Sequence, residues 1–205
     1  MTLETRADTF SGGFLRPVFD SQSVFRIVLD ALARPGQVKP LAARTSPPKP
    51  LPPLAVDITA ALADQETSVY LCPALAKAKT PAGWLRFQTG ASVTANPAEA
   101  DFVIAASPQT LPPLSQLAVG MPDYPDRSAT VIVAVPSFDG GLPVTLSGPG
   151  IKNQQAFAPD GVSLPLWQQL VANHALYPRG IDVIFVSGEA IAGLPRSTQI
   201  EIGEA

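Results

Sequence analysis

The chain of 205 residues contains one cysteine and one histidine, Cys72 and His174. A single cysteine excludes an internal disulfide and a cysteine-based zinc cluster, and a single histidine excludes every metal motif with two histidines. A serine hydrolase would need His174 as its base, yet no Gly-x-Ser-x-Gly motif is present to hold the nucleophile. We therefore predict that Cys72 is a buried core thiol and that His174 packs near the end of a helix.

Charged residues are also scarce, at 15% of the chain, and the net charge is −3. This acidic balance argues against binding along a nucleic-acid backbone, which needs a basic surface. The two common phosphate-binding glycine motifs are absent from the sequence. No apolar run approaches the roughly 20 residues that span a bilayer, and the first residues lack an apolar signal core. We expect a cytoplasmic protein that contacts neither nucleic acid nor membrane.

Hydrophobic residues are abundant, at 46% of the chain, which predicts one well-packed domain over residues 1–205. We expect an irregular N-terminal arm over residues 1–20, whose Phe10, Phe14 and Phe19 would lie on the domain or on a neighbouring subunit. Residues 42–54 are rich in proline and predict a stiff surface loop. A polyproline II ligand for an aromatic groove is the alternative interpretation of this loop.

Apolar spacing predicts two clear helices and a short one. The first runs from Asp20 or Ser21 to Ala33, before the helix-stopping pair Pro35-Gly36. The second covers residues 163–176, and the short helix covers about residues 56–63. The expected buried faces are Phe25, Val28, Leu29 and Leu32 on the first helix, and Leu164, Trp167, Leu170 and Val171 on the second.

Six segments read as strands: residues 68–72, 100–105, 130–135, 144–147, 182–186 and 199–202. Residues 129–135 and 181–186 are apolar on both faces, which predicts central strands covered on each side. Residues 138–141 read as a hairpin turn, which would make the sheet mixed. The sequence therefore predicts a three-layer α/β/α domain with a mixed sheet.

Five residues are candidates for contact with an anion or a partner subunit. Arg179 and Arg196 each follow a proline beside a predicted strand, and a guanidinium can hold a phosphate or phosphonate through two hydrogen bonds. Gly148 and Gly150 form a turn that could offer backbone amides. Arg34 ends a charged stripe on the first helix that could face solvent or an interface.

Structural roles are the alternative for these residues. The arginines could pair with Asp182, Glu189 or Glu201, and the Gly148–Gly150 turn could simply end a strand. No residue is predicted to be catalytic, to bind a cofactor or to bind a metal. Lys152 is the one lysine with surroundings that suit a Schiff base, and it is expected to be exposed, so we expect no cofactor.

Taken in order, several blocks of the sequence resemble the PhnH family, the H subunit of the bacterial carbon–phosphorus lyase system for phosphonate use. The resemblance covers nearly the whole chain and is carried by residues 13–14, 17–20, 25–26, 29–31, 34–36, 146–151, 177–182 and 195–198. It implies a fold similar to a reduced large domain of the pyridoxal-phosphate (PLP)-dependent transferases, without the cofactor lysine. It also implies a homodimer that assembles with the G, I, J and K subunits.

The activity implied by this resemblance is the formation of alpha-D-ribose 1-methylphosphonate 5-triphosphate from ATP and methylphosphonate, during organophosphonate catabolism. Three hypotheses follow for this chain. The first is a structural, organising dimer that is not catalytic alone. The second is direct binding of the phosphonate or triphosphate anion through Arg179 or Arg196. The third is a PLP-type transferase that acts alone.

Overall fold

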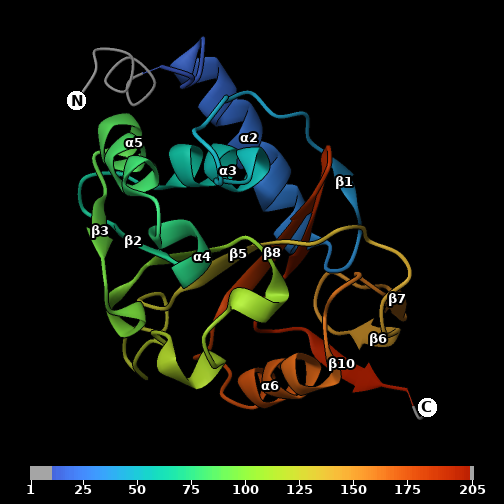
Figure 1. The fold of residues 1–205 in the computed structure, drawn as a ribbon. Coiled ribbons are helices and arrows are strands. Elements are labelled where there is room, and N and C mark those ends of the chain that lie inside the picture. The colour runs from blue at the N-terminus through green and yellow to red at the C-terminus, as the bar shows by residue number, and fades with distance from the viewer. Residues whose placement is uncertain (1–10, 204–205) are drawn as a thin grey trace.

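The computed structural model describes residues 11–203 and shows a mixed α/β fold built on a seven-stranded sheet (Figure 1). The strand order is β1-β9-β8-β5-β4-β2-β3. The strands are β1 (Lys39–Pro40), β2 (Ser68–Leu71), β3 (Ser92–Thr94), β4 (Phe102–Ala105), β5 (Thr130–Ala134), β8 (Asp182–Ser187) and β9 (Ala190–Leu194). The strands β8, β5, β4, β2 and β3 run parallel to one another. Strand β9 pairs antiparallel with β8 on one side and with β1 on the other, so β1 runs in the same direction as β8. The predicted mixed sheet is confirmed.

A second sheet has three antiparallel strands: β10 (Gln199–Ile202), β6 (Val144–Ser147) and β7 (Gln155–Phe157). The predicted hairpin at residues 138–141 is therefore wrong, because β5 and β6 belong to different sheets. The antiparallel neighbour of the parallel core is β9 instead. It follows β8 through a tight turn in which Ser187 pairs with Ala190.

Helices lie on both faces of the large sheet (Figure 1). One face carries α2 (Pro17–Ala33), α3 (Pro53–Leu62) and α5 (Lys79–Thr89), and the other carries α6 (Leu164–His174) and the small sheet. The short elements are α4 (Pro73–Ala76), η1 (Pro97–Glu99), η2 (Pro108–Thr110) and η3 (Leu114–Gln116). Among residues 11–203, no helix is long and apolar enough to cross a membrane.

The central strand β5 joins the two cores of the molecule. Val131 and Val133 pack in the core that contains Trp167 of α6, and Ile132 packs in the core that contains Val28 of α2. This alternation follows from the two-residue period of a strand. It confirms the prediction that the segment is central and covered on both sides.

Helix α2 begins at Pro17, three residues before Asp20 and four before Ser21, the two predicted caps. Proline is favourable in the first turn because its amide hydrogen would have no partner there. The predicted arm over residues 1–20 is therefore too long. Its Phe14 packs partly buried against the core, Phe19 is 67% exposed on α2, and Phe10 lies outside the described residues.

The buried face of α2 differs from the predicted one. Val24, Val28 and Ala31 point inward, whereas Phe25 and Leu29 are 46% and 56% exposed. The cause is a close contact with β9: a Cβ atom built on Gly193 would lie 2.7 Å from the backbone of Ala31. Such an approach needs small residues on both elements, so Ala31 and not a larger side chain sets the inward face.

The other two predicted helices also need correction. On α6, Trp167 and Leu170 are buried as expected, but Leu164 and Val171 are exposed. Asn173 is buried instead, because its amide bonds both the N–H and the carbonyl of Ile181. Helix α3 starts at Pro53, so the proline-rich loop ends at residue 52.

Candidate functional site

Arg196 is the most fully engaged of the candidate arginines. Its Nε and Nη2 donate to the two carboxylate oxygens of Asp182, at 3.1 and 2.5 Å, and its backbone N–H donates to the same carboxylate at 2.8 Å. Its Nη1 donates to the carbonyl of Pro125 at 2.6 Å. Each guanidinium nitrogen is thus already bonded within the chain. Of the alternatives, the pairing with Asp182 is the one that the structure contains.

His174 joins the same group of residues. Its Nδ1 lies 3.1 Å from the carbonyl oxygen of Arg196. Because a carbonyl can only accept, Nδ1 carries the proton in this contact. His174 is the last residue of α6, as predicted, and it ties that helix to the turn after β9. A histidine held in this way is a structural residue, and no serine hydroxyl of residues 11–203 bonds to its ring.

The turn Gly148–Gly150 lies between two other segments of the chain. A Cβ atom on Gly150 would lie 2.2 Å from the carbonyl oxygen of Ala33, at the end of α2. A Cβ atom on Gly148 would lie 3.1 Å from the carbonyl oxygen of Ser197. Both glycines have positive φ angles, 116° and 85°. They therefore allow close packing of the small sheet against α2 and against the turn that contains Arg196.

The guanidinium groups of Arg34 and Arg179 form fewer hydrogen bonds and ion pairs than that of Arg196. Arg34 forms an ion pair with Asp30, which also contacts Lys39 at 2.8 Å. The guanidinium of Arg179 has no hydrogen bond or ion pair with another of residues 11–203. Arg179 lies just before β8, and Asp182 is the first residue of that strand. The candidate residues thus gather near the amino end of β8 and the end of α2, whereas ligands of open α/β sheets bind at the carboxyl ends.

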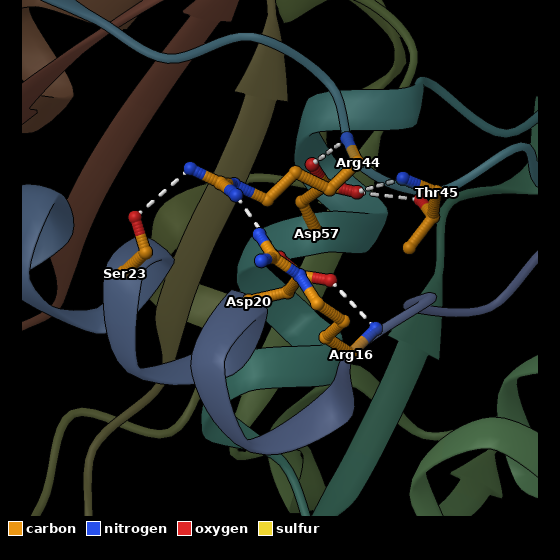
Figure 2. Close-up of polar contacts among 6 residues, drawn as sticks. All are labelled: Arg16, Asp20, Ser23, Arg44, Thr45 and Asp57. Atoms are coloured by element: carbon orange, nitrogen blue, oxygen red, sulfur yellow. Dashed lines mark hydrogen bonds and ion pairs between the residues drawn. The ribbon is translucent and has the colours of Figure 1, made fainter.

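A second polar cluster was not predicted from the sequence. Figure 2 shows Arg44 between two residues of α2: its Nη1 donates to Asp20 at 3.0 Å and its Nη2 donates to Ser23 at 2.9 Å. Asp20 is 5% exposed and also accepts from the backbone N–H of Arg16 at 2.8 Å. A carboxylate in the first turn of a helix is favourable because the N-terminal end of a helix is positive. Arg44 therefore holds the start of α2 against the loop after β1.

Asp57 fixes the other side of this loop (Figure 2). Its carboxylate accepts from the backbone N–H groups of Arg44 and Thr45, at 2.7 and 3.0 Å, and from the Thr45 hydroxyl at 2.5 Å. Asp57 is fully buried on α3, and this burial raises the pKa of its carboxyl above the usual value, although the three hydrogen bonds oppose the shift. The signal in the sequence is an aspartate inside an otherwise apolar helix, which must have partners.

A cavity of about 540 Å³ opens near the carboxyl ends of β2 and β3. Its polar groups come from Tyr70, Lys77 and Thr94, and its walls are otherwise apolar. Burial raises the pKa of the Tyr70 phenol, with a smaller contribution from Cys72. Burial also raises the pKa of the Cys72 thiol to about 12, so it is protonated at neutral pH and is a core thiol as predicted.

The reactive sites to compare with residues 11–203 are a metal cluster and a Schiff-base lysine. No group of three or more His, Cys, Asp and Glu side chains in this range could hold a metal ion. Lys152 is exposed, as predicted, and an exposed lysine does not suit a Schiff base, which needs a desolvated amine. The polar contacts of Arg196, Arg44 and Asp57 instead tie segments of the fold together.

The sequence matches the family model described as "Bacterial phosphonate metabolism protein (PhnH)" over residues 12–201. The chain belongs to the PhnH family. It is 41% identical over 202 residues to the alpha-D-ribose 1-methylphosphonate 5-triphosphate synthase subunit PhnH of Rhizobium meliloti (strain 1021), with 97% of this chain and 99% of the relative covered. The PhnH resemblance predicted from the sequence blocks is confirmed.

A second relative comes from another organism. The chain is 34% identical over 183 residues to a protein of Stutzerimonas stutzeri named as a C-P lyase subunit, HtxG. This match covers 88% of the chain and 86% of the relative. The PhnH family model also spans all five candidate residues, from Arg34 to Arg196.

Proposed function

We propose that the chain is a subunit of the carbon–phosphorus lyase core complex and works in the cytoplasm as an organising dimer. With its partner subunits it would form alpha-D-ribose 1-methylphosphonate 5-triphosphate from ATP and methylphosphonate during organophosphonate catabolism. The observation that carries this proposal is the 41% identity to a subunit of that synthase over nearly the full length of both chains.

The chemistry of the described side chains supports an organising role over a catalytic one. Arg196 is bonded through all three guanidinium nitrogens, and the thiol of Cys72 is buried and protonated. The Nδ1 of the single histidine is hydrogen-bonded to a backbone carbonyl. A bond-making site needs a nucleophile beside a base, and these groups are all committed elsewhere.

The partners in this proposal are a second copy of the chain and the G, I, J and K subunits, as the family resemblance implies. The proposal also includes a likeness to a reduced PLP-transferase large domain. The mixed sheet between helical layers supports this likeness. We do not propose a PLP-dependent activity, because the lysine with suggestive surroundings, Lys152, is exposed.

A direct role in anion binding is the second candidate function, and one observation favours it. The guanidinium of Arg179 has no partner among residues 11–203, so it remains available for a phosphonate or a triphosphate. In the assembled complex, Arg179→Ala would then weaken substrate binding while assembly stays intact. A loss of assembly in this variant would indicate a subunit contact instead.

The decisive experiment compares the chain alone with the reconstituted complex. We expect the purified chain to form no product from ATP and methylphosphonate, and the complex to form it only when the chain is included. Size-exclusion chromatography with light scattering would report the dimer and its incorporation. Turnover by the isolated chain, or full activity of a complex without it, would contradict the organising role.

A further inference from the structure

The outer face of α2 carries large apolar side chains that nothing in residues 11–203 covers. Val18 is 78% exposed, Phe25 46% and Leu29 56%. Positions 18, 25 and 29 are separated by seven and four residues, so they lie on one side of the helix. Val24, Val28 and Ala31 lie on the adjoining side of the helix, about a third of a turn away, and are buried. The apolar surface of α2 therefore extends beyond its buried side, and an apolar helix surface is normally covered.

A recess continues this surface at the start of α2. Its volume is about 320 Å³, and its lining includes Phe14, Pro17, Val18 and Trp84. Val18 thus belongs to both the recess and the outer face of α2. A hollow beside an exposed apolar stripe suits an inserted side chain, because the residues that dominate protein interfaces fill such pockets.

This face carries one cation without a carboxylate partner among residues 11–203, Arg26. Arg26 lies between the apolar positions, is exposed, and has no ion pair or hydrogen bond with another of residues 11–203. Arg16 and Arg34, at the two ends of the helix, have exposed guanidinium groups, although each lies near an aspartate. The whole chain is acidic, with a net charge of −3, so an exposed arginine here is a local feature. Its complement is a carboxylate.

Arg26 also argues against a second copy of the chain on this face. The midpoint of α2 is Phe25, next to Arg26. Symmetric pairing of two such helices about their midpoints would bring the two copies of Arg26 together, since a twofold interface opposes each patch to itself. Like charges in that position are unfavourable.

We propose that the outer face of α2, defined by Val18, Phe25, Arg26 and Leu29, binds a different subunit of the carbon–phosphorus lyase complex through an apolar surface that carries carboxylates. This proposal rests on the proposed function and adds to it the surface and the chemistry of the partner. Any homodimer then uses another part of the chain.

Cysteine labelling tests the proposal on the intact protein. Cys72 is the only cysteine and is buried with a pKa of about 12, so a cysteine introduced at the surface reacts selectively. The reporter variant is Leu29→Cys. The matched control is Leu164→Cys on α6, where the native leucine is 45% exposed. Each variant is labelled with a maleimide, alone at several concentrations and in the reconstituted complex.

We expect the Leu29→Cys thiol to react at the same rate as the control in the isolated chain at every concentration. In the complex, its rate should fall about tenfold or more while the control stays fast. Three outcomes would overturn the proposal. Slower labelling of the isolated chain at high concentration would indicate a second copy on this face, and slow labelling at every concentration would indicate that residues 1–10 cover it. Fast labelling in the complex would indicate that no partner occupies the face.

Substitutions then test the chemistry of the partner. Phe25→Ser combined with Leu29→Ser should weaken incorporation into the complex by about 30-fold or more, as expected for central interface residues. Arg26→Glu should weaken it by about tenfold, and less at high salt, because a charge contact is screened. The controls are Leu164→Ser and Arg127→Glu, which should incorporate normally. Arg127 is an exposed arginine outside α2 whose guanidinium lies over the Tyr124 ring. An unchanged affinity of the Arg26 variant would overturn the carboxylate partner.

The failure of this proposal differs from the failure of the proposed function. If the wild-type chain does not enter the complex at all, the proposed function fails and this proposal fails with it. If the wild-type chain and the α2 variants enter equally well, the proposed function stands and the docking surface is wrong. Circular dichroism of each variant shows whether a loss of incorporation comes from unfolding.

Discussion

The two faces of helix α2 differ in the size and the burial of their side chains. The inner face is built from small or branched residues and one buried carboxylate, and it fits closely against β9 and the loop that contains Arg44. The outer face carries larger apolar residues, Phe25 and Leu29, which are 46% and 56% exposed. Shape thus decides which face is buried, because the backbone approach at Gly193 leaves no room for a large side chain. The larger apolar residues lie at the surface, where we expect a partner subunit to bind them.

Substitutions that disturb the inner face of α2 or its contacts should lower the free energy of unfolding. Substitutions on the outer face of α2 should leave it unchanged. The largest effect is expected at Asp57 of α3, which fixes the loop whose Arg44 contacts the inner face of α2. Asp57→Ala leaves three donors from Arg44 and Thr45 without their acceptor. We expect a loss of about 4 kcal/mol, measured by urea unfolding. Thr45→Val removes one donor and should cost about 1 kcal/mol. Equal costs would show that the buried carboxylate is not the centre of this network.

The next largest effect is expected where α2 approaches β9. Gly193→Val forces a side chain against the backbone of Ala31 and should lower the free energy of unfolding by about 3 kcal/mol. Gly203→Val is the matched control, since a Cβ atom there meets nothing within 4 Å, and it should change stability by about 0.5 kcal/mol or less. If both variants unfold at the same urea concentration, close packing does not select the inner face of α2.

A smaller effect is expected at the turn after β9. Arg196→Ala removes two hydrogen bonds to Asp182 and one to Pro125, and should cost about 2 kcal/mol in the same assay. Arg179→Ala should cost about 0.5 kcal/mol or less, because its guanidinium bonds to nothing among residues 11–203. If Arg196→Ala keeps the free energy of unfolding of the wild type but impairs substrate binding, Arg196 binds the ligand and does not stabilise the fold.

The smallest effect on stability is expected on the outer face. Phe25→Ser and Leu29→Ser replace exposed side chains, so the free energy of unfolding should change by about 0.5 kcal/mol or less. Incorporation into the complex should nevertheless weaken strongly. A loss of several kcal/mol in the isolated chain would mean that these residues are buried in the folded protein, and the contrast between the two faces would disappear.

Much of the fold could be predicted from the sequence. The segments later found as β5 and β8 are apolar throughout, and residues buried on both faces of a parallel sheet have this composition. The inner face of α2 could not be predicted, because two apolar stripes satisfy the helical period and only the contact between Ala31 and Gly193 decides between them. The strand β9 was missed because small residues such as Ala192 and Gly193 interrupt its apolar pattern.

The anion or partner contacts of the five candidate residues stay a prediction, but part of their arrangement could be read from the sequence. The sequence blocks containing Gly150 and Arg196 identified the segments that meet near the amino end of β8. The pairing of Arg196 with Asp182 was one of the alternatives that the sequence offered. The contact of Gly150 with Ala33 could not be found from local patterns, because Ala33 is far away in the sequence. Asp57 did carry a signal, a carboxylate within an apolar helix, but its partners lie 12 and 13 residues away in an irregular loop.

The most direct test of an organising subunit is synthase activity as a function of the concentration of this chain, added to the remaining subunits. An organising role predicts that the combined Phe25→Ser and Leu29→Ser variant needs about 30-fold more protein for half-maximal activity, yet reaches the same maximal turnover as the wild type. A lower maximal turnover at saturation, or product formed by this chain alone, would contradict it.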